Sequence, residues 1–324
     1  MSILLGILVG LALPVQTSVN NKLRDKVGTP YNSSLVSFII STVFLACLLL
    51  VTGQGFHLPM DQLAGEPFWV WLGGLCGVVF LTANVILLTK LGSAETVILP
   101  VLGQLLMGLL VDSLGLFRAQ QIPLTPLRAG GAVLVLAGVM VVAWSGQAAA
   151  AQGQRPAGRL WLWRIVGVAA GMFSATQTAI NGHLGQVVGS PLTASMVSFL
   201  VGLAALVVLV LTLVGVGTTI SSIVSQRRNE IGLRKALGAS SRAIGTEFYI
   251  ESSLYGLIGG LIGTAIGYGL ASWLCVAVFE RSIVFNWWLA LISVLFSALV
   301  AIVASIPPVH RATRIDPAVV LREE

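Results

Sequence analysis

Nine long apolar stretches, separated by short polar segments, make up most of this chain. A helix needs about 20 mostly apolar residues to cross the hydrocarbon core of a bilayer, and in lipid its backbone must satisfy its own hydrogen bonds. The pattern therefore predicts an all-α polytopic membrane protein with about nine transmembrane helices. The expected spans cover roughly residues 3–21, 33–52, 68–89, 94–115, 129–147, 162–181, 196–223, 248–276 and 285–307.

Composition and charge agree with this class. Hydrophobic residues make up 56% of the 324 residues and charged residues only 9%, so we expect membrane lipid to surround the chain. The formal net charge of +6 comes from Lys and Arg in loops between spans, which argues against a nucleic-acid partner. With the amino terminus outside, only Arg118, Arg128 and Arg281 of the 18 basic residues lie outside, so the positive-inside rule predicts a cytoplasmic carboxyl terminus. We expect the bacterial inner (plasma) membrane.

The sequence contains an internal repeat. Residues 10–38 and 171–199 share a pattern in which Gln16 recurs as Gln177 and Asn20 recurs as Asn181. Five predicted spans lie between the start of the first copy and the start of the second. Because that number is odd, the second copy is expected to enter the membrane in the opposite direction. Partial inverted repeats of this kind are typical of secondary transporters.

The repeat, the stretch "LGQLLMGLLVDSLGLF" (102–117) and the "RAGG" that begins at Arg128 resemble the YdcZ-type family of the drug/metabolite transporter superfamily. This resemblance covers about residues 1–210. It implies a five-span transporter repeat over 1–150 and the start of a second, inverted repeat, with two spans, over 160–210.

Polar side chains inside the predicted spans are the candidates for a substrate path, because unsatisfied amides are costly in lipid and usually point inward. Gln16 and Asn20 share one helical face, and the repeat gives Gln177 and Asn181 the same spacing. Such a duplicated pair suits a pseudo-symmetric transport site, and it equally suits amides that cross-link helices. The full set of candidates is Gln16, Asn20, Gln177, Asn181, Gln104 and Asn84.

From about residue 213 to 324 the chain changes character. The pieces "SIVSQRRNEIGLRKALGAS", "FYIESSLYGLIGGLIG" and "IPPVHRATRIDPAVVLREE" resemble the carboxy-terminal part of FtsX-like permeases, the membrane subunits of MacB-type ABC systems. The resemblance implies that 227–238 is a short cytoplasmic helix that touches a separate ATPase subunit, and that two spans follow it. The candidate coupling residues are Arg228, Glu230, Leu233, Arg234 and Lys235. A basic anchor that only fixes the topology is the alternative.

Small residues recur in the span that follows this segment. Gly259, Gly263 and Gly267 are spaced four residues apart on one helical face, where they would let two helices approach closely. Helix packing is their expected role, and a homodimer is one way to provide the partner helix.

Catalytic motifs are missing from the sequence. It has no GxxxxGK[ST] phosphate loop and no Ser/His/Asp or zinc-type spacing, so we expect neither an enzyme nor a catalytic residue, metal or cofactor. Three interpretations of function follow. The first is a secondary carrier for a small metabolite or drug-like molecule, and the second is a permease subunit served by a separate ATPase. The third is a hybrid that folds without transporting, since both resemblances cover only part of their families' usual pattern.

Overall fold

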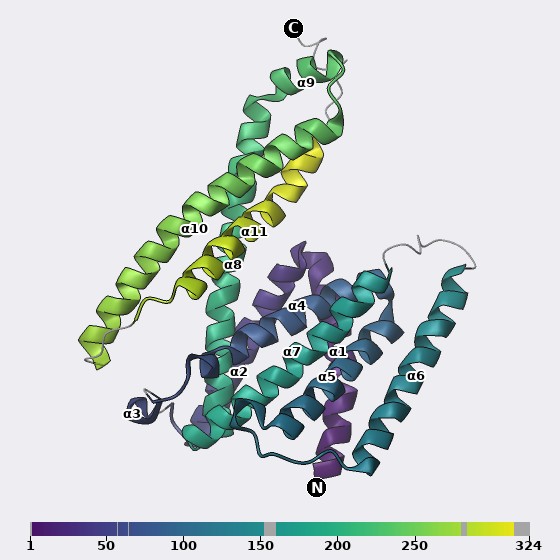
Figure 1. Cartoon of the computed structure of the whole chain (residues 1–324), viewed down its shortest axis with the longest axis vertical. Coiled ribbons are helices and arrows are strands. Elements are labelled where there is room, and N and C mark those ends of the chain that lie inside the picture. Colours follow the sequence, from purple (N-terminus) through teal and green to yellow (C-terminus); the bar gives the residue numbers. More distant parts are fainter. Residues whose placement is uncertain (1, 57, 64, 152–159, 280–283, 314–324) are drawn as a thin grey trace. The chain divides into compact units, whose positions relative to one another are not determined.

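A computed structural model describes residues 2–56, 58–63, 65–151, 160–279 and 284–313 of the chain. Within these residues the secondary structure consists of helices and no strands, which confirms the all-α class (Figure 1). The helices are α1 (Ser2–Val27), α2 (Pro30–Val51), α3 (Met60–Leu63), η1 (Phe68–Trp71), α4 (Gly73–Leu91), α5 (Ser93–Leu114), η2 (Leu116–Arg118), α6 (Pro126–Ala151), α7 (Leu160–Val187), α8 (Pro191–Gln226), α9 (Arg228–Ala236), α10 (Ser241–Phe279) and α11 (Trp287–Ala312).

Each of the nine predicted spans falls on a long helix. Among the described residues, six helices are long and apolar enough to cross a membrane: α2, α4, α5, α8, α10 and α11. The protein is therefore polytopic, and the prediction is confirmed for these six spans. The other three predicted spans lie on α1, α6 and α7, whose described residues do not form an equally long apolar stretch. The predicted third span began too early, because residues 68–71 form the separate helix η1.

Contacts between residues divide the chain into two compact units, Met1–Val207 and Val208–Glu324. The boundary falls inside α8, so this helix contributes its first half to one unit and its second half to the other. These are unit 1 and unit 2.

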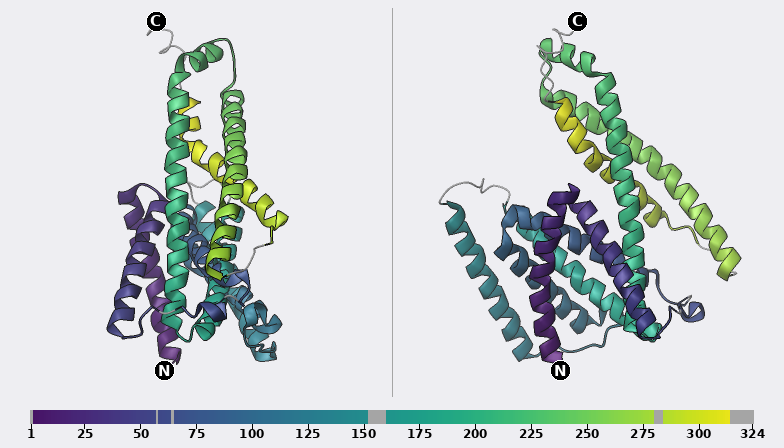
Figure 2. Two further views of the ribbon diagram at one scale, coloured as in Figure 1. Left: turned by 90° about the vertical axis from the view of Figure 1, so that its left-hand side faces the viewer. Right: turned by 180° about the vertical axis from the view of Figure 1, so that it is seen from behind.

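The internal repeat produces the same local structure twice in unit 1. Gly28 and Gly189 take positive φ angles of 85° and 70° at the ends of α1 and α7. The next residue caps the following helix in both copies: the Thr29 hydroxyl accepts a bond from the amide of Asn32, and that of Ser190 accepts one from Thr193. A proline then opens α2 and α8 at the first helical position, where its missing N–H costs nothing. The view from behind in Figure 2 shows the first of these turns joining α1 to α2.

Glycines bring the central helices of unit 1 into backbone contact. A Cβ added at Gly103 of α5 would overlap the carbonyl oxygen of Val168 in α7, and one at Gly171 of α7 would overlap that of Pro100. A Cβ at Gly74 of α4 would overlap the carbonyl oxygen of Ser198 in α8. Close backbone approach of this kind is how helices gain packing in lipid, where apolar burial drives no association. Helices α4, α5 and α7 therefore form the rigid centre of unit 1.

In unit 2, α10 packs along α11 through one face of small residues (Figure 1). Phe248, Ser252, Gly256 and Gly260 recur every four residues on α10 and are buried. A Cβ at Gly256 would come within 2.6 Å of Cα of Ala298, so the contact requires glycine there. Helix α9 joins this unit by burying Ile231 in a cluster with residues of α8, α10 and α11.

Candidate functional site

A cavity of about 270 Å³ lies between α1, α4 and α5 in unit 1. Three of the six predicted substrate-path residues line it, one from each helix: Gln16, Asn84 and Gln104. The lining residues are Gly10, Leu13, Pro14, Gln16, Thr17, Phe80, Leu81, Asn84, Thr96, Val97, Pro100, Val101 and Gln104, and none of them is charged. The fold thus brings together polar side chains from distant parts of the sequence, since Gln16 and Gln104 lie 88 residues apart.

Two prolines in the wall of this cavity lie inside continuous helices. Pro14 lies inside α1 and Pro100 lies inside α5. Proline has no N–H for the carbonyl four residues earlier, so the carbonyls of Gly10 and Thr96 lose their usual partners. Both of these residues also line the cavity. Pro14 and Pro100 were not among the residues predicted from the sequence, although a proline within an apolar span is a signal that points to such a site.

The three cavity amides differ in their surroundings. Nε2 of Gln104 donates to Oγ of Ser174 in α7 at 3.1 Å, which fixes that side chain. Asn84 is 6% exposed, and its Oδ1 has no hydrogen-bond partner among the described residues. Gln16 is exposed and lines the cavity. A buried amide oxygen without a donor is costly, and because Oδ1 of Asn84 has almost no accessible surface, it belongs to the packed wall of the cavity.

The second copy of the amide pair has a different position. Gln177 packs over Gly77 of α4, where an added Cβ would come within 2.6 Å of its Nε2, and Asn181 packs over Gly73 one turn away. Neither residue is among those that line the cavity, and nor is Asn20. The duplicated pair therefore does not line one common cavity, and for Gln177 and Asn181 the contacts favour the alternative of helix packing.

The two copies also differ in one hydrogen bond. Oγ of Ser37 donates to Oδ1 of Asn20 at 2.7 Å, which links α1 to α2. The equivalent residues are Ser198 and Asn181, and both Oγ of Ser198 and Oδ1 of Asn181 are buried without a partner among the described residues. Both copies of the repeat have Ser and Asn at these positions, but the hydrogen bond is present in the first copy and absent in the second.

A charged cluster joins three segments of unit 1 away from the cavity. Nε2 of His183 in α7 lies 2.8 Å from Oε2 of Glu66, and Nη1 of Arg118 in η2 contacts both oxygens of the same carboxylate, at 2.9 and 2.7 Å. The hydrogen bond from His183 is the main cause that lowers the pKa of Glu66, and Arg118 adds to it. Arg118 and its neighbour Phe117 both take positive φ angles, of 57° and 58°. No sequence pattern predicts this cluster, because its members are far apart along the chain.

Helix α9 carries the predicted coupling residues, and its polar side faces α10. Glu230 and Arg234 form an i, i+4 ion pair at 2.6 Å, and Arg234 also reaches Glu247 of α10 at 2.8 Å. Arg227 contacts Glu230, Glu247 and Glu251, and its guanidinium lowers the pKa of the Glu230 carboxyl. This network fixes α9 on the end of α10.

The other coupling candidates have different neighbours. Nζ of Lys235 donates to the backbone carbonyl of Thr313 at the end of α11, so this residue holds the unit together. Arg228 is exposed, as is Leu233 with 52% of its surface accessible, and Leu237 follows with 81%. Gly238, with φ of 95°, ends the segment, and Oγ of Ser240 caps α10 by accepting from the amide of Ala243.

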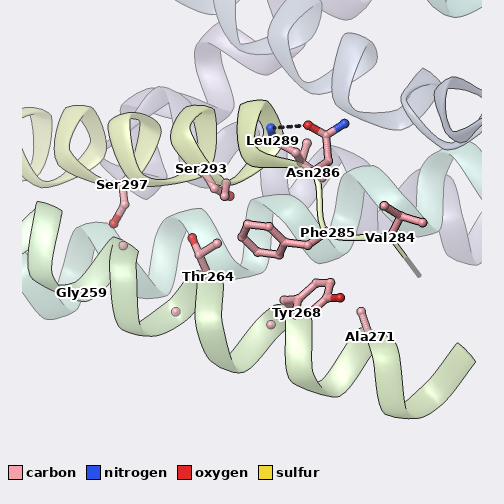
Figure 3. Close-up of a pocket in the computed structure, with 14 residues that line it drawn as sticks. Gly259, Thr264, Tyr268, Ala271, Val284, Phe285, Asn286, Leu289, Ser293 and Ser297 are labelled. Atoms are coloured by element: carbon pink, nitrogen blue, oxygen red, sulfur yellow. Dashed lines mark hydrogen bonds between the residues drawn. The ribbon is translucent and has the colours of Figure 1, made fainter. Parts of the chain in front are cut away.

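A second hollow, of about 460 Å³, lies between α10 and α11 (Figure 3). Gly259, Gly263 and Gly267 line it, and a Cβ added at any of them would meet nothing within 4 Å. The rings of Tyr268 and Phe285 meet edge to face at one end, with centroids 4.9 Å apart. The close packing of α10 within this chain thus runs through Gly256 and Gly260 and not through the three predicted glycines. Their packing role stays a prediction, since none of the three makes a close contact among the described residues of unit 2.

Two protein-family models match different parts of the chain. Residues 1–141 and 162–229, which are more than half of the chain, match the family model described as "Putative inner membrane exporter, YdcZ". The chain belongs to the YdcZ family. Residues 202–317 match a second model, "FtsX-like permease C-terminal", so residues 202–229 are covered by both. Both resemblances seen in the sequence are confirmed, and the protein is an integral membrane transporter or permease of bacterial inner-membrane type.

Curated proteins of the ABC transporter class are similar to part of this chain. An uncharacterized ABC transporter permease, YknZ of Bacillus subtilis, is 42% identical over 101 residues, which are 31% of this chain and 25% of the relative. The macrolide export ATP-binding/permease protein MacB of Bdellovibrio bacteriovorus is 36% identical over 132 residues, 41% of this chain and 20% of the relative. This chain thus spans about a quarter or less of these relatives. No solved structure matches it.

Proposed function

We propose that the protein is a secondary carrier that moves a small metabolite or drug-like molecule across the bacterial inner membrane. The observation that carries this proposal is the uncharged, amide-lined cavity in unit 1, the part that matches the exporter family. Its walls include Pro14 and Pro100, and a proline within an apolar span is a recurring pointer to the binding site of a carrier. In this account all nine long helices span the bilayer as a partial inverted repeat, with the amino terminus outside and the carboxyl terminus in the cytoplasm.

The cavity amides provide the test of this proposal. Purified protein in liposomes would be exposed to a mixture of metabolites under a proton or sodium gradient, and the accumulated solutes would be identified by mass spectrometry. We expect Asn84→Leu and Gln104→Leu to abolish the accumulation seen with the unaltered protein. Thr212→Val is the matched control, because Thr212 lies outside the cavity and bonds only its own helix at the carbonyl of Val208. Accumulation that is equal in all four proteins would contradict the proposal.

A second candidate function rests on α9. The match to FtsX-like permeases and the exposed Leu233 and Leu237 favour a permease subunit that a separate ATPase engages through this helix. Photo-crosslinking from Leu233 in bacterial membranes tests it. Leu237→Glu should abolish capture of an ATPase, because Leu237 is exposed and supports no contact that holds α9 in place. Arg234→Glu is less informative, since it would place a third acid beside Glu230 and Glu247 and loosen α9 itself. If the folded protein captures no ATPase and transports no solute, the result would support the third interpretation, a hybrid that folds without transporting.

A further inference from the structure

The side chains around the unit 1 cavity carry no charge. Among the residues that the structure describes, no Lys, Arg, His, Asp or Glu lines it. Its polar side chains are three amides and two hydroxyls, those of Gln16, Asn84, Gln104, Thr17 and Thr96. The lining thus offers hydrogen-bonding groups, but it holds no side chain that could neutralise the charge of a ligand.

The two charged residues of α5 are paired outside the cavity. Glu95 directly precedes Thr96, and its carboxylate accepts two bonds from Arg164 of α7, at 2.8 and 2.9 Å. At the other end of α5, Asp112 pairs with Arg128 of α6. Neither carboxylate lines the cavity, so neither compensates a cation there.

On the other two helices of the cavity, the charges lie beyond the lining. The ammonium of Lys90, the charged residue of α4, lies over the ring of Trp163, 5.6 Å from its centroid. The charges of α1 begin at Lys22, after Thr17, the last residue of this helix that lines the cavity. An anion in the cavity therefore lacks a partner from the lining as much as a cation does.

We infer that the cavity takes a small uncharged molecule and excludes both cations and anions. This inference rests on the proposed carrier function and names the substrate class of the same cavity. Removing an ion from water costs far more than removing a neutral polar group, unless a partner of opposite charge is present. The amides of Gln16 and Gln104 each carry a carbonyl oxygen and N–H groups, so they suit neutral ligands with donors, acceptors or both. The volume of about 270 Å³ fits a small solute, since sites for drug-sized ligands occupy roughly 300–1,000 Å³.

Three thiol reagents that differ in charge test this inference at one position. Leu81 lines the cavity from α4, and Leu81→Cys places a thiol there. The hydroxyethyl methanethiosulfonate is neutral, the trimethylammonium-ethyl analogue is a permanent cation, and the sulfonatoethyl analogue is an anion. Rates would be measured on full-length protein in detergent by peptide mass spectrometry, which separates position 81 from Cys47, Cys76 and Cys275. Val51→Cys is the reference, since Val51 is 85% exposed and lies outside the cavity.

Each charged reagent's rate would be divided by the neutral reagent's rate at the same thiol, so that the reactivity of the thiol cancels. We expect both relative rates to be about tenfold lower at position 81 than at position 51, because the charge loses water in the cavity without gaining a partner. A charged reagent with the same relative rate at both positions would overturn the inference, since the cavity would accept that charge. Failure of all three reagents at position 81, with normal labelling at position 51, would overturn the carrier proposal as well, because no solute could then reach the cavity.

A charge added to the lining separates the effect of charge from that of size. Gln104→Glu introduces a carboxylate, to which the hydroxyl of Ser174, now 3.1 Å from the amide nitrogen, can donate. In the Leu81→Cys protein at pH 8, well above the ordinary pKa of a glutamate carboxyl, this change should raise the relative rate of the cation about tenfold and leave the anion slow.

Gln54→Glu is the matched control for the added charge. Gln54 is exposed, lies outside the cavity and also bonds a serine, since its Oε1 accepts from Ser190 at 2.9 Å. This variant should leave both relative rates at position 81 unchanged. If Gln104→Glu leaves them unchanged as well, size and not charge sets the order of the rates, and the inference is wrong.

Discussion

Oγ of Ser37 lies 2.7 Å from Oδ1 of Asn20 and joins the first two helices, while the equivalent pair in the second repeat, Ser198 and Asn181, makes no such bond. The repeat therefore provides its own control. Ser37→Ala would leave the oxygen of Asn20, a residue 5% exposed, without its donor, at a cost of about 1–3 kcal/mol. Ser198→Ala has no bond to lose and should cost much less. Thermal unfolding of the purified variants measures the difference, and equal losses in both would show that the bond between Ser37 and Asn20 adds no stability.

The glycine contact between α5 and α7 gives a second prediction. Gly103→Ala would push a methyl group into the carbonyl of Val168, and because backbone cannot rotate away, the helices must separate at a cost of about 1–3 kcal/mol. Gly108→Ala lies on the same helix with nothing within 4 Å of the new Cβ, and it should be neutral or slightly stabilising, since alanine favours helix by up to about 1 kcal/mol. The fraction of folded protein after heating, read by size-exclusion chromatography, compares the two. A Gly108→Ala protein as unstable as Gly103→Ala would contradict the packing described for this helix pair.

The charged cluster around Glu66 predicts a dependence on pH. Its pKa is lowered in the folded protein, chiefly by the hydrogen bond from His183, so the folded state binds the proton less readily than the unfolded state. The stabilisation is therefore present above the ordinary carboxyl pKa of 4.5 and is lost as the pH falls through the lowered value. Glu66→Gln should cost about 1 kcal/mol at pH 7, a figure that allows for the exposure of Arg118.

The pH profile separates this charge effect from a general loss of packing. The unfolding temperature of the unaltered protein should fall between pH 5 and pH 3 more steeply than that of the Glu66→Gln variant. Parallel profiles would mean that Glu66 contributes no charge-dependent stability, whatever the size of the loss at neutral pH.

The sequence predicts the helices better than their contacts. Apolar length alone located all nine long helices, because hydrophobicity reports the solvent in which a segment lies. The family resemblance likewise predicted a short helix over 227–238, and the segment ends at Gly238, because glycine tolerates the positive φ angle found there. Which helix faces which is a tertiary property. Four-residue spacing placed Gly259, Gly263 and Gly267 on one face, yet the neighbouring face with Gly256 and Gly260 meets α11.

The candidate site shows the same limit. Polarity within a span singled out Gln16, Asn84 and Gln104, and the fold brings these three to one cavity. Polarity also singled out Gln177 by its repeat partner, and this residue packs on Gly77 instead. A residue's type indicates that its side chain must point inward, but the helix that it then meets depends on how the bundle packs, which one sequence does not encode in any local pattern.

The energy source of transport tests the central claim most directly. Protein in sealed liposomes, loaded with neither ATP nor an ATPase subunit, would be given a proton or sodium gradient, and uptake of the solutes that the metabolite mixture identifies would be followed over time. The carrier account predicts accumulation that needs the gradient, stops when an ionophore dissipates it, and is absent with Asn84→Leu. Accumulation that occurs only when a partner ATPase and ATP are supplied, and that persists in Asn84→Leu, would contradict the carrier account.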